Sequence, residues 1–431
     1  DRLIDLPGHR RPPVRIAIAV EGTRGDVHPM LALGESFARA GCEVVICAPP
    51  DFRDTAGERG LAFRPVGRNV REFLEERSHL LHGSAWAALR EGARFFRDNL
   101  ALHFEALVDA TAGADRVFGA GTEVAAASVA EARGISYRYI AYCPALFPSA
   151  EHPAFVVPNQ DLPGWLNRWT WRAFAIGMNR MMRRAVNRHR GALGLPPLRD
   201  IFAHTFGAAP LLAAEPALAP APADADLAIE PIGCLHPFAA EPLPAKLEAF
   251  LAAGETPVYI GFGSMTDPAP AQTTRTVLEA VARAGCRAVL SEGWAGLGAG
   301  PLPEGVCVVG SVSHAALFPR VAAVVHHGGA GTTTTAARAG APQLVVPHVL
   351  DQFYWAKRVA QLGIGLPALR RNRLDAGALA DALREITANE VLAERAAQVG
   401  ERLRRDLALR TDAAQVLLRR SRRDHPTAYD P

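Results

Sequence analysis

Glycines, threonines and histidines are concentrated in one short stretch, VVHHGGAGTTTTAARAG, residues 324–340. An apolar run precedes the glycines and a helix-forming run follows them, so we expect a turn between a strand and a helix. Glycine lets the backbone approach a ligand closely, and the free N–H groups at a helix N-terminus attract phosphate. A diphosphate site and an ordinary tight turn are both open interpretations of this stretch alone. Its spacing fits neither a P-loop nor the glycine pattern of an NAD-binding turn.

A second pair of polar residues, Asp351 and Gln352, follows the next apolar run, QLVVPH. In a parallel sheet, ligands bind at the carboxyl ends of the strands. A carboxylate and an amide beside a diphosphate site could hold the hydroxyls of a sugar. Alternatively, Asp351 caps the helix that follows it, and the two interpretations are compatible.

The elements that position these residues alternate regularly. VRIAIAV (14–20) is expected to be a buried strand, and PMLALGESFARAG a helix that Gly41 ends. Such alternation predicts parallel sheets with helices on both faces, and it restarts after a Pro- and Ala-rich linker. The fold class is therefore α/β, with two tandem Rossmann-like, doubly wound domains. We expect a disordered leader at 1–13, an N-terminal domain at 14–232, a linker at 233–245, a C-terminal domain at 246–405 and a C-terminal helix at 406–431.

Composition excludes several classes of protein. The chain has 431 residues, of which 49% are hydrophobic and 21% charged, as expected of a globular enzyme. A formal net charge of +3 does not indicate nucleic acid as a partner. No apolar run reaches the length of a membrane span. The six cysteines are scattered without metal-binding spacing, which favours free thiols in the cytoplasm.

Taken together, the motifs resemble those of a known family. His-Gly-Gly-Ala-Gly-Thr (327–332), followed by Asp-Gln (351–352), resembles the donor signature of GT-B, family 1-type glycosyltransferases. GTRGDVHP (22–29) is similar to a motif of the branch that contains bacterial antibiotic and natural-product enzymes and sterol glucosyltransferases. The resemblance covers nearly the whole chain after residue 14. Further motifs stand in the family's order: PNQDLPGWLNR (158–168), GFGSM (261–265), SEGW (291–294) and GSVSH (310–314).

The resemblance implies that a nucleotide sugar, UDP-glucose or a dTDP-sugar, binds mainly to the C-terminal domain. The diphosphate would face His327 and the first turn of the following helix, and the base would be read at 311–312. Thr335 stands where plant-type relatives carry a glutamate for the ribose, so UDP and dTDP both remain open. The implied donor-binding residues are Gly25, Ser264, Trp294, Ser311, Val312, His327, Gly329, Ala330, Gly331, Thr332, Asp351 and Gln352.

Asp26 aligns with the family position that holds the catalytic base. The base takes a proton from the acceptor hydroxyl as that hydroxyl attacks the sugar. The alternative is that Asp26 caps a helix led by Pro29. GAGTEVAAAS offers no convincing second acid, so Asp26 would act alone or with help from His28. The helix terminus and His327 offset the leaving charge, so no metal is expected, and Asp224-Ala225-Asp226 is interpreted as a solvated linker turn.

Residues 142–195 would line the acceptor cleft, and 162–194 are expected to form a long helix. Its Trp165 and Trp169 share a face with Ala173 and Ile176. We favour packing of this face on the core; a lipophilic entrance or contact with an anionic membrane surface are the alternatives. Besides His28, Phe147 and Trp171 are predicted to contact the acceptor.

These inferences predict an inverting, metal-independent transferase. It would move a glucose-like hexose to a hydroxyl of a lipophilic polyketide, macrolide or sterol-like molecule, as a cytoplasmic monomer or homodimer. The alternatives are a nucleotide-sugar epimerase of the same fold and a non-catalytic helper protein. An NAD-dependent oxidoreductase is disfavoured, because no acidic ribose partner follows a GxGxxG turn.

Overall fold

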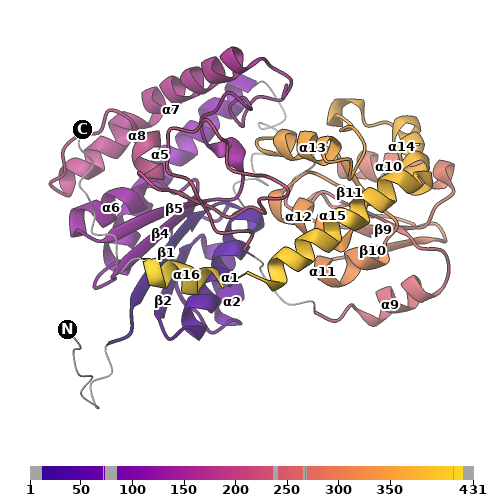
Figure 1. Ribbon diagram of the computed structural model, residues 1–431, viewed down its shortest axis with the longest axis horizontal. Helices are drawn as coiled ribbons and strands as arrows, with labels where there is room; N and C mark the ends of the chain where they lie inside the picture. Colours follow the sequence, from indigo (N-terminus) through magenta and orange to yellow (C-terminus); the bar gives the residue numbers. More distant parts are fainter. Residues whose placement is uncertain are drawn as a thin grey trace.

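The computed structural model describes residues 12–70, 72, 85–235, 241–265, 267, 269–410 and 412–420. These residues form two parallel sheets, each with helices packed around it, and the two sheets lie in separate lobes (Figure 1). The predicted α/β class is confirmed. The leader expected at 1–13 falls almost wholly outside the described residues, as does the end of the predicted C-terminal segment, 421–431.

The N-terminal lobe contains a seven-stranded sheet in the order β3-β2-β1-β4-β5-β6-β7. Its strands are β1 (Arg15–Glu21), β2 (Glu43–Ala48), β3 (Ala62–Pro65), β4 (Arg116–Gly121), β5 (Ser136–Ala141), β6 (Leu211–Leu212) and β7 (Glu230–Pro231). Its helices are α1 (Arg24–Arg39), α2 (Arg53–Gly57), α5 (Ala85–Ala110), α6 (Ala125–Arg133), α7 (Gly164–Ala192) and α8 (Ile201–Phe206), with 3-10 turns at Pro50–Phe52 and Pro144–Leu146.

Strand β1 shows why this sheet is covered on both faces. Ile16 and Ile18 pack in a cluster with Met30 of α1. The alternate residues, Ala17 and Ala19, pack in another cluster with the buried side chains of α5 and α6. Because successive side chains of a strand point to opposite faces, an unbroken apolar run serves both layers.

The C-terminal lobe contains a five-stranded sheet in the order β10-β9-β8-β11-β12. Its strands are β8 (Val258–Gly261), β9 (Ala288–Ser291), β10 (Val306–Val309), β11 (Val324–His326) and β12 (Gln343–Val345). Its helices are α9 (Ala245–Ala252), α10 (Pro270–Ala284), α11 (His314–Leu317), α12 (Ala330–Ala339), α13 (Gln352–Gln361), α14 (Ala376–Ala388) and α15 (Glu390–Ala408), with 3-10 turns at Phe318–Arg320 and Arg371–Arg373.

Both sheets reverse their strand order beside the first strand of the lobe. In the first sheet β1 lies between β2 and β4, and in the second β8 lies between β9 and β11. The carboxyl end of a sheet at such a reversal is where α/β proteins bind ligands. Asp26 follows β1, and 327–332 follow β11, so both lie at these ends.

The last described helix, α16 (Ala413–Arg420), leaves the C-terminal lobe and packs against α1 (Figure 1). Ala414 and Leu417 are buried in the core beside β1. The side chain of Ser36 on α1 hydrogen-bonds the carboxylate of Asp412. The chain therefore passes between the lobes twice, once after β7 and once between α15 and α16.

Candidate active site

The turn after β11 is shaped by His326, which the sequence interpretation passed over in favour of its neighbour. The fully buried His326 accepts the N–H of Gly328 at Nδ1 (3.1 Å) and donates from Nε2 to Gln343 Oε1 (2.9 Å). Burial lowers its pKa to about 3, so the ring stays neutral and keeps this tautomer. Gly328 has φ 93°, where a side chain would be strained. His326 thus fixes the path of the backbone into α12.

His327 lies between two glycines. A Cβ added to Gly263 would come 2.8 Å from its Cε1, and one added to Gly329 would come 2.6 Å from its Nε2. Nδ1 is buried and has no hydrogen-bond partner among the described residues. Burial lowers the pKa to about 4, so the ring offers a neutral N–H rather than a positive charge. A buried polar atom without a partner is unfavourable, which indicates a place for a polar ligand.

The N-terminus of α12 is open in front of this ring. Gly329 is the N-cap, and a Cβ added to Gly331 would lie more than 4 Å from every described residue outside its own stretch of helix. The first N–H groups, from Ala330 to Thr332, have no partner within the helix. Thr335, at the position of the plant-type glutamate, instead donates its hydroxyl to the carbonyl of Gly331 (2.8 Å). This helix end is suited to an anion.

Two further predicted donor residues lie at the ends of β8 and β9. Ser264 is nearly buried, and its hydroxyl has no hydrogen-bond partner in the described part of the chain. The N–H of Trp294 donates to the carbonyl of Gly263 (2.9 Å), which joins the two loops. The guanidinium of Arg24, from the N-terminal lobe, lies 6.0 Å from the centre of the Trp294 ring. Gly25, Ser311 and Val312 are all at least partly exposed, Val312 packing on the neighbouring core.

Asp351 precedes α13 but does not cap it with its side chain, so the capping interpretation is wrong. Its Oδ2 accepts from Trp355 Nε1 (3.1 Å). Gln352 uses its oxygen to accept the N–H groups of His348 (2.8 Å) and Val349 (3.1 Å). The predicted sugar contact of Gln352 therefore depends on its amide nitrogen, which lies 3.3 Å from Met265 Sδ.

The loop before Asp351 is strained. Leu350 has φ 56°, the one positive value among described residues other than glycine. Such a conformation is unfavourable for leucine and persists only where its surroundings enforce it. The bonds from Gln352 to the loop supply that constraint.

Asp26 is the third residue of α1, which begins at Arg24 and not at Pro29 as expected. Its Oδ2 accepts the N–H of Thr23, the N-cap, at 2.9 Å. Oδ1 has no hydrogen-bond partner within the described residues. Helix capping and a role as base therefore use different oxygens of one carboxylate. Gly22 leaves room for the Asp26 carboxylate in this position, because a Cβ on residue 22 would lie 2.2 Å from Oδ2.

The environment of Asp26 makes its carboxyl group a weaker acid. Burial raises its pKa to about 7, against the effect of the Thr23 N–H, and the charges of Asp351 and Glu21 raise it further. Burial also raises the pKa of Asp351, to about 6. His28 is neutral as well, since burial and the charges of neighbouring arginines lower its pKa to about 4.

The acid in GAGTEVAAAS, Glu123, does not complete a pair with Asp26, as expected from the sequence. Glu123 is fully buried, accepts the N–H of Ala125 (2.6 Å) and pairs with His103 Nδ1 of α5. His103 Nε2 lies 3.4 Å from Glu21 Oε1, at the end of β1. Burial opposes protonation of His103, but the two carboxylates outweigh it and raise the pKa to about 10. Glu123 thus forms a buried ion pair with His103 and does not partner Asp26 or His28.

Of the three residues predicted to contact the acceptor, Phe147 and Trp171 are packed in the core, whereas His28 is only partly buried. Phe147 is fully buried, with its ring 5.4 Å from that of Phe206. Trp171 is 3% exposed and donates from Nε1 to the carbonyl of His152 (3.2 Å). Neither presents surface to an acceptor in this structure. Trp171 lies on the face of α7 that packs inward. The face with Trp165 and Trp169, which the sequence favoured for packing, is exposed instead.

Asp224 lies in a partly exposed turn, as predicted, but its carboxylate is bound to other side chains and backbone. Its carboxylate accepts from Ser149 Oγ (2.5 Å) and the N–H of Ala150 (2.8 Å), and it pairs with Arg168 (2.8 Å). It ties this turn to the acceptor-side segment and to α7. In the described ranges, no group of three or more His, Cys, Asp and Glu side chains is arranged to hold a metal ion.

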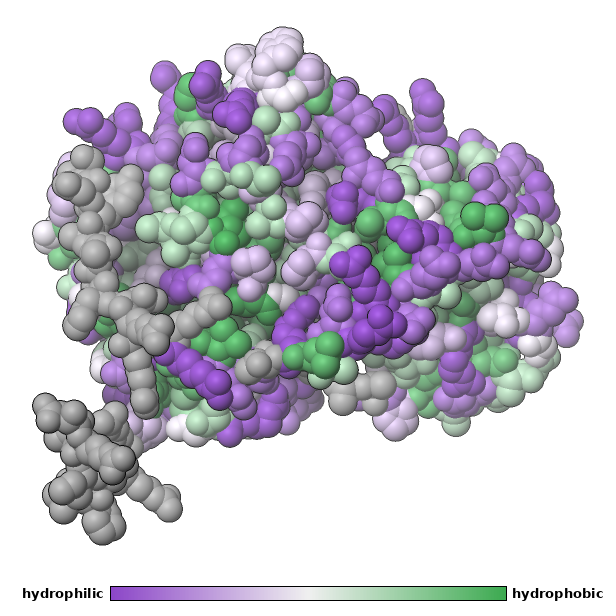
Figure 2. Space-filling view, in the orientation of Figure 1, coloured by the Kyte–Doolittle hydropathy of each residue, from purple (hydrophilic) through white to green (hydrophobic). Residues whose placement is uncertain are grey.

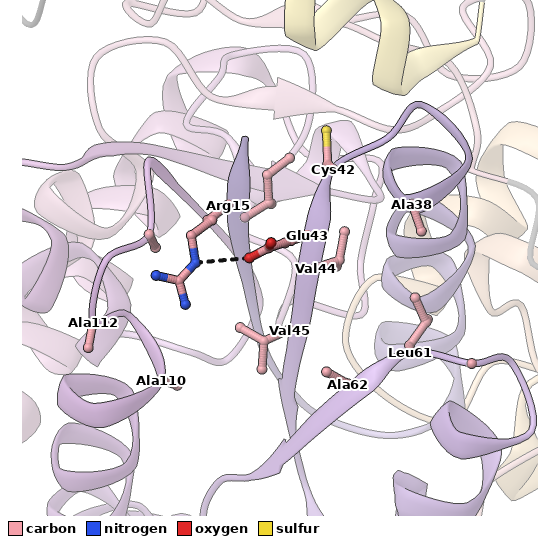
Figure 3. A pocket seen from close by; sticks show the side chains of 13 residues that line it. Arg15, Ala38, Cys42, Glu43, Val44, Val45, Leu61, Ala62, Ala110 and Ala112 are labelled. Carbon is pink, nitrogen blue, oxygen red and sulfur yellow. Dashed lines mark ion pairs between the residues drawn. The ribbon is translucent and has the colours of Figure 1, made fainter. Parts of the chain in front are cut away.

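A cavity of about 390 Å³ lies far from this chemistry (Figure 3). It is lined by residues at the amino ends of the strands, including Arg15, Glu43 and Ala62, the first residues of β1, β2 and β3. Arg15 and Glu43 form an exposed ion pair across it (3.2 Å). Ligands of parallel sheets bind at the opposite, carboxyl ends, so this cavity is not the candidate site.

The chain matches two domain families and several known proteins. Residues 16–144 match the glycosyltransferase family 28 N-terminal domain, and residues 275–410 match the C-terminal domain of erythromycin biosynthesis protein CIII-like proteins. A vancomycin aglycone glucosyltransferase of Amycolatopsis orientalis is 37% identical over 366 residues, covering 82% of this chain and 85% of that protein. A sterol 3-beta-glucosyltransferase of Eremothecium gossypii is 32% identical over 412 residues, covering 92% of this chain but 33% of the longer relative.

The fold is shared with solved glycosyltransferases. The structure of the glycosyltransferase VinC in complex with dTDP superposes with a TM-score of 0.69 at 21% identity, covering 95% of this chain and 99% of VinC. With two parallel sheets whose carboxyl ends carry Asp26 and the α12 turn, and with these matches along both lobes, the chain belongs to the family 1-type glycosyltransferases of GT-B fold, in the branch of the antibiotic and sterol glycosyltransferases.

Proposed function

We propose that this glycosyltransferase moves a hexose from a UDP- or dTDP-sugar to a hydroxyl of a lipophilic natural product, with inversion at the anomeric carbon. The observation that carries the proposal is that the first turn of α1, which holds Asp26, meets the donor side of the second lobe, where the guanidinium of Arg24 lies 6.0 Å from the centre of the Trp294 ring. A base and a sugar-holding carboxylate must meet at one cleft for this reaction. The charge of Asp351, which raises the pKa of Asp26, supports such a meeting.

On the donor side, the diphosphate would lie at the N-terminus of α12, facing the N–H of His327 and the hydroxyl of Ser264. The unpartnered Nδ1 of His327 supports this assignment. Asp351 would accept from a sugar hydroxyl with the oxygen that Trp355 does not use.

On the acceptor side, Oδ1 of Asp26 would take the hydroxyl proton as the acceptor oxygen bonds to the anomeric carbon. The bond from that carbon to the diphosphate breaks on the opposite side, so the configuration inverts. The leaving negative charge would be stabilised by the α12 terminus, which offers preorganised donors. We therefore expect turnover to persist when divalent cations are chelated.

A thermal-shift screen with UDP, dTDP, UDP-glucose and NAD tests the donor. A nucleotide present at about 100 times its Kd stabilises the fold by roughly 2.7 kcal/mol, which a melting curve resolves. Stabilisation by UDP or dTDP supports the proposal and selects the nucleotide. Stabilisation by NAD alone would contradict it. Release of an altered sugar without any acceptor would instead identify an epimerase.

A further inference from the structure

The outer face of α7 carries aromatic and cationic side chains in one stripe. Its members are spaced four, three, four, four and three residues apart, so they lie on one side of the helix. They are Trp165, Trp169, Arg172, Ile176, Arg180 and Arg183, which we call the α7 stripe. Trp165 is 72% exposed, Trp169 59% and Ile176 69%. The opposite side of the helix, with Trp171, Met182 and Val186, is buried, so the stripe does not belong to the core.

The charge of this helix has one sign. Between Gly164 and Ala192 there are seven arginines and no aspartate or glutamate. Arg190 is buried against Glu131, and Arg168 pairs with Asp224. The remaining five form no ion pair with any described residue: Arg172, Arg180, Arg183, Arg184 and Arg188. Figure 2 shows hydrophilic side chains along the top of the molecule, over α7.

Exposed tryptophans beside unpaired arginines fit a lipid surface. Tryptophan prefers the headgroup level of a bilayer, and arginines are attracted to anionic headgroups. A second copy is disfavoured as the occupant, because a symmetric contact would place the same arginines against one another. We propose that the α7 stripe docks the enzyme on an anionic phospholipid surface, with α7 parallel to the bilayer. Docking is peripheral, because no described helix is both long and apolar enough to cross a membrane.

The stripe begins just after a segment that contacts the second lobe. Lys357 of α13 pairs with Asp161 (3.1 Å) and donates to the carbonyl of Gln160, just before α7. Helix α13 itself starts next to Asp351. If the proposed function holds, a lipophilic acceptor dissolved in the bilayer approaches the cleft from this end.

Co-sedimentation of the full chain with vesicles tests the docking, without donor or acceptor. We expect binding to phosphatidylcholine mixed with phosphatidylglycerol, weakened by salt, and none to phosphatidylcholine alone. The double variant R180Q/R183Q should partition about thirtyfold more weakly, at about 1 kcal/mol per arginine. W165S/W169S should lose binding and the blue shift of tryptophan fluorescence on vesicles. Matched surface variants on α15, R402Q/R405Q and V391S, should bind like the wild type.

Several results would overturn the proposal. Absence of binding to anionic vesicles, or equal binding to neutral ones, excludes an anionic surface. Binding that needs the arginines but not the tryptophans identifies a general polyanion site. A dimer in light scattering that W165S/W169S dissociates assigns the stripe to a second copy. Because no reaction is measured, failure of the transferase proposal leaves this test unaffected, and melting curves show whether each variant is folded.

Discussion

Asp26 and Asp351 stand in different lobes, yet the charge of Asp351 raises the pKa of Asp26. Both carboxyl groups have raised pKa values, about 7 for Asp26 and about 6 for Asp351. When both are ionised they repel each other, and a bound sugar hydroxyl or an acceptor proton relieves the repulsion.

The first prediction concerns the pH profile. If Asp26 must be ionised to accept a proton, kcat/KM rises with pH through about 7. D351N removes a neighbouring negative charge and so lowers the pKa of Asp26. The rise in kcat/KM should therefore move to lower pH, even if the variant is also slower. D381N, an exposed aspartate on α14, should leave its position unchanged. A rise centred near pH 4 in the wild type would contradict the raised pKa of Asp26.

The second prediction separates catalysis from stability at Asp26. D26N should lower kcat by roughly a factor of 10²–10⁴, the usual contribution of a general base. Because the folded pKa exceeds the unfolded one, ionised Asp26 destabilises the fold as pH rises from about 4 to above 7. The variant should therefore gain melting temperature relative to wild type at pH 8 but not at pH 4. Asparagine retains an oxygen for the N–H of Thr23. Near-normal turnover in D26N would require a different base.

The third prediction uses the open space at Gly331. In G331A the new Cβ comes within 4 Å of no described residue outside its own stretch of helix, so the helix should gain about 1 kcal/mol from the alanine. The same Cβ occupies the space proposed for the diphosphate, so the thermal shift with nucleotide should fall. G377A, in the first turn of α14, is the control, where stability changes without loss of nucleotide binding. Full nucleotide affinity in G331A would place the donor elsewhere.

The fourth prediction concerns the buried pair of His103 and Glu123. E123Q leaves the imidazolium without its nearest partner and should cost about 3–5 kcal/mol in urea unfolding at pH 7. The raised pKa of His103 gives stability that is complete below about 6.5 and lost as pH rises through about 10. The lowered pKa of Glu123 gives stability that is lost in acid. E279Q, in an exposed ion pair, should cost under about 1 kcal/mol. Equal effects would show that the buried pair is unimportant.

Local sequence patterns are sufficient to predict the strands and the turn that leads into α12. The apolar runs at β1 and β11 and the glycines between β11 and α12 each leave a signal in a few adjacent residues. The start of α1 was missed although it has such a signal. Thr23 and Asp26, three residues apart, resemble a capping box, which predicts a helix starting at Arg24.

Other features depend on tertiary contacts that no short pattern records. His103 and Glu123 meet because α5 and the end of β4 are neighbours in space, although twenty residues separate them. The spacing of Trp165 and Trp169 shows that they share a face, but not whether that face is covered. The side of α7 that carries Trp171 is the buried side, because it faces the aromatic rings of Phe155 and Phe202.

The double passage of the chain between the lobes limits how they can move. Lobes joined by one linker can rotate in any direction. Two adjacent connections restrict the lobes to rotation about a single hinge axis that runs through both connections. Buried Glu215 holds Arg338 of α12 and Arg410 of the second connection together, near the axis of such a hinge. Opening would then move α12 and the nucleotide sugar bound to it away from Asp26 along one path. Closing would bring the sugar back to the same position relative to Asp26 at every turnover.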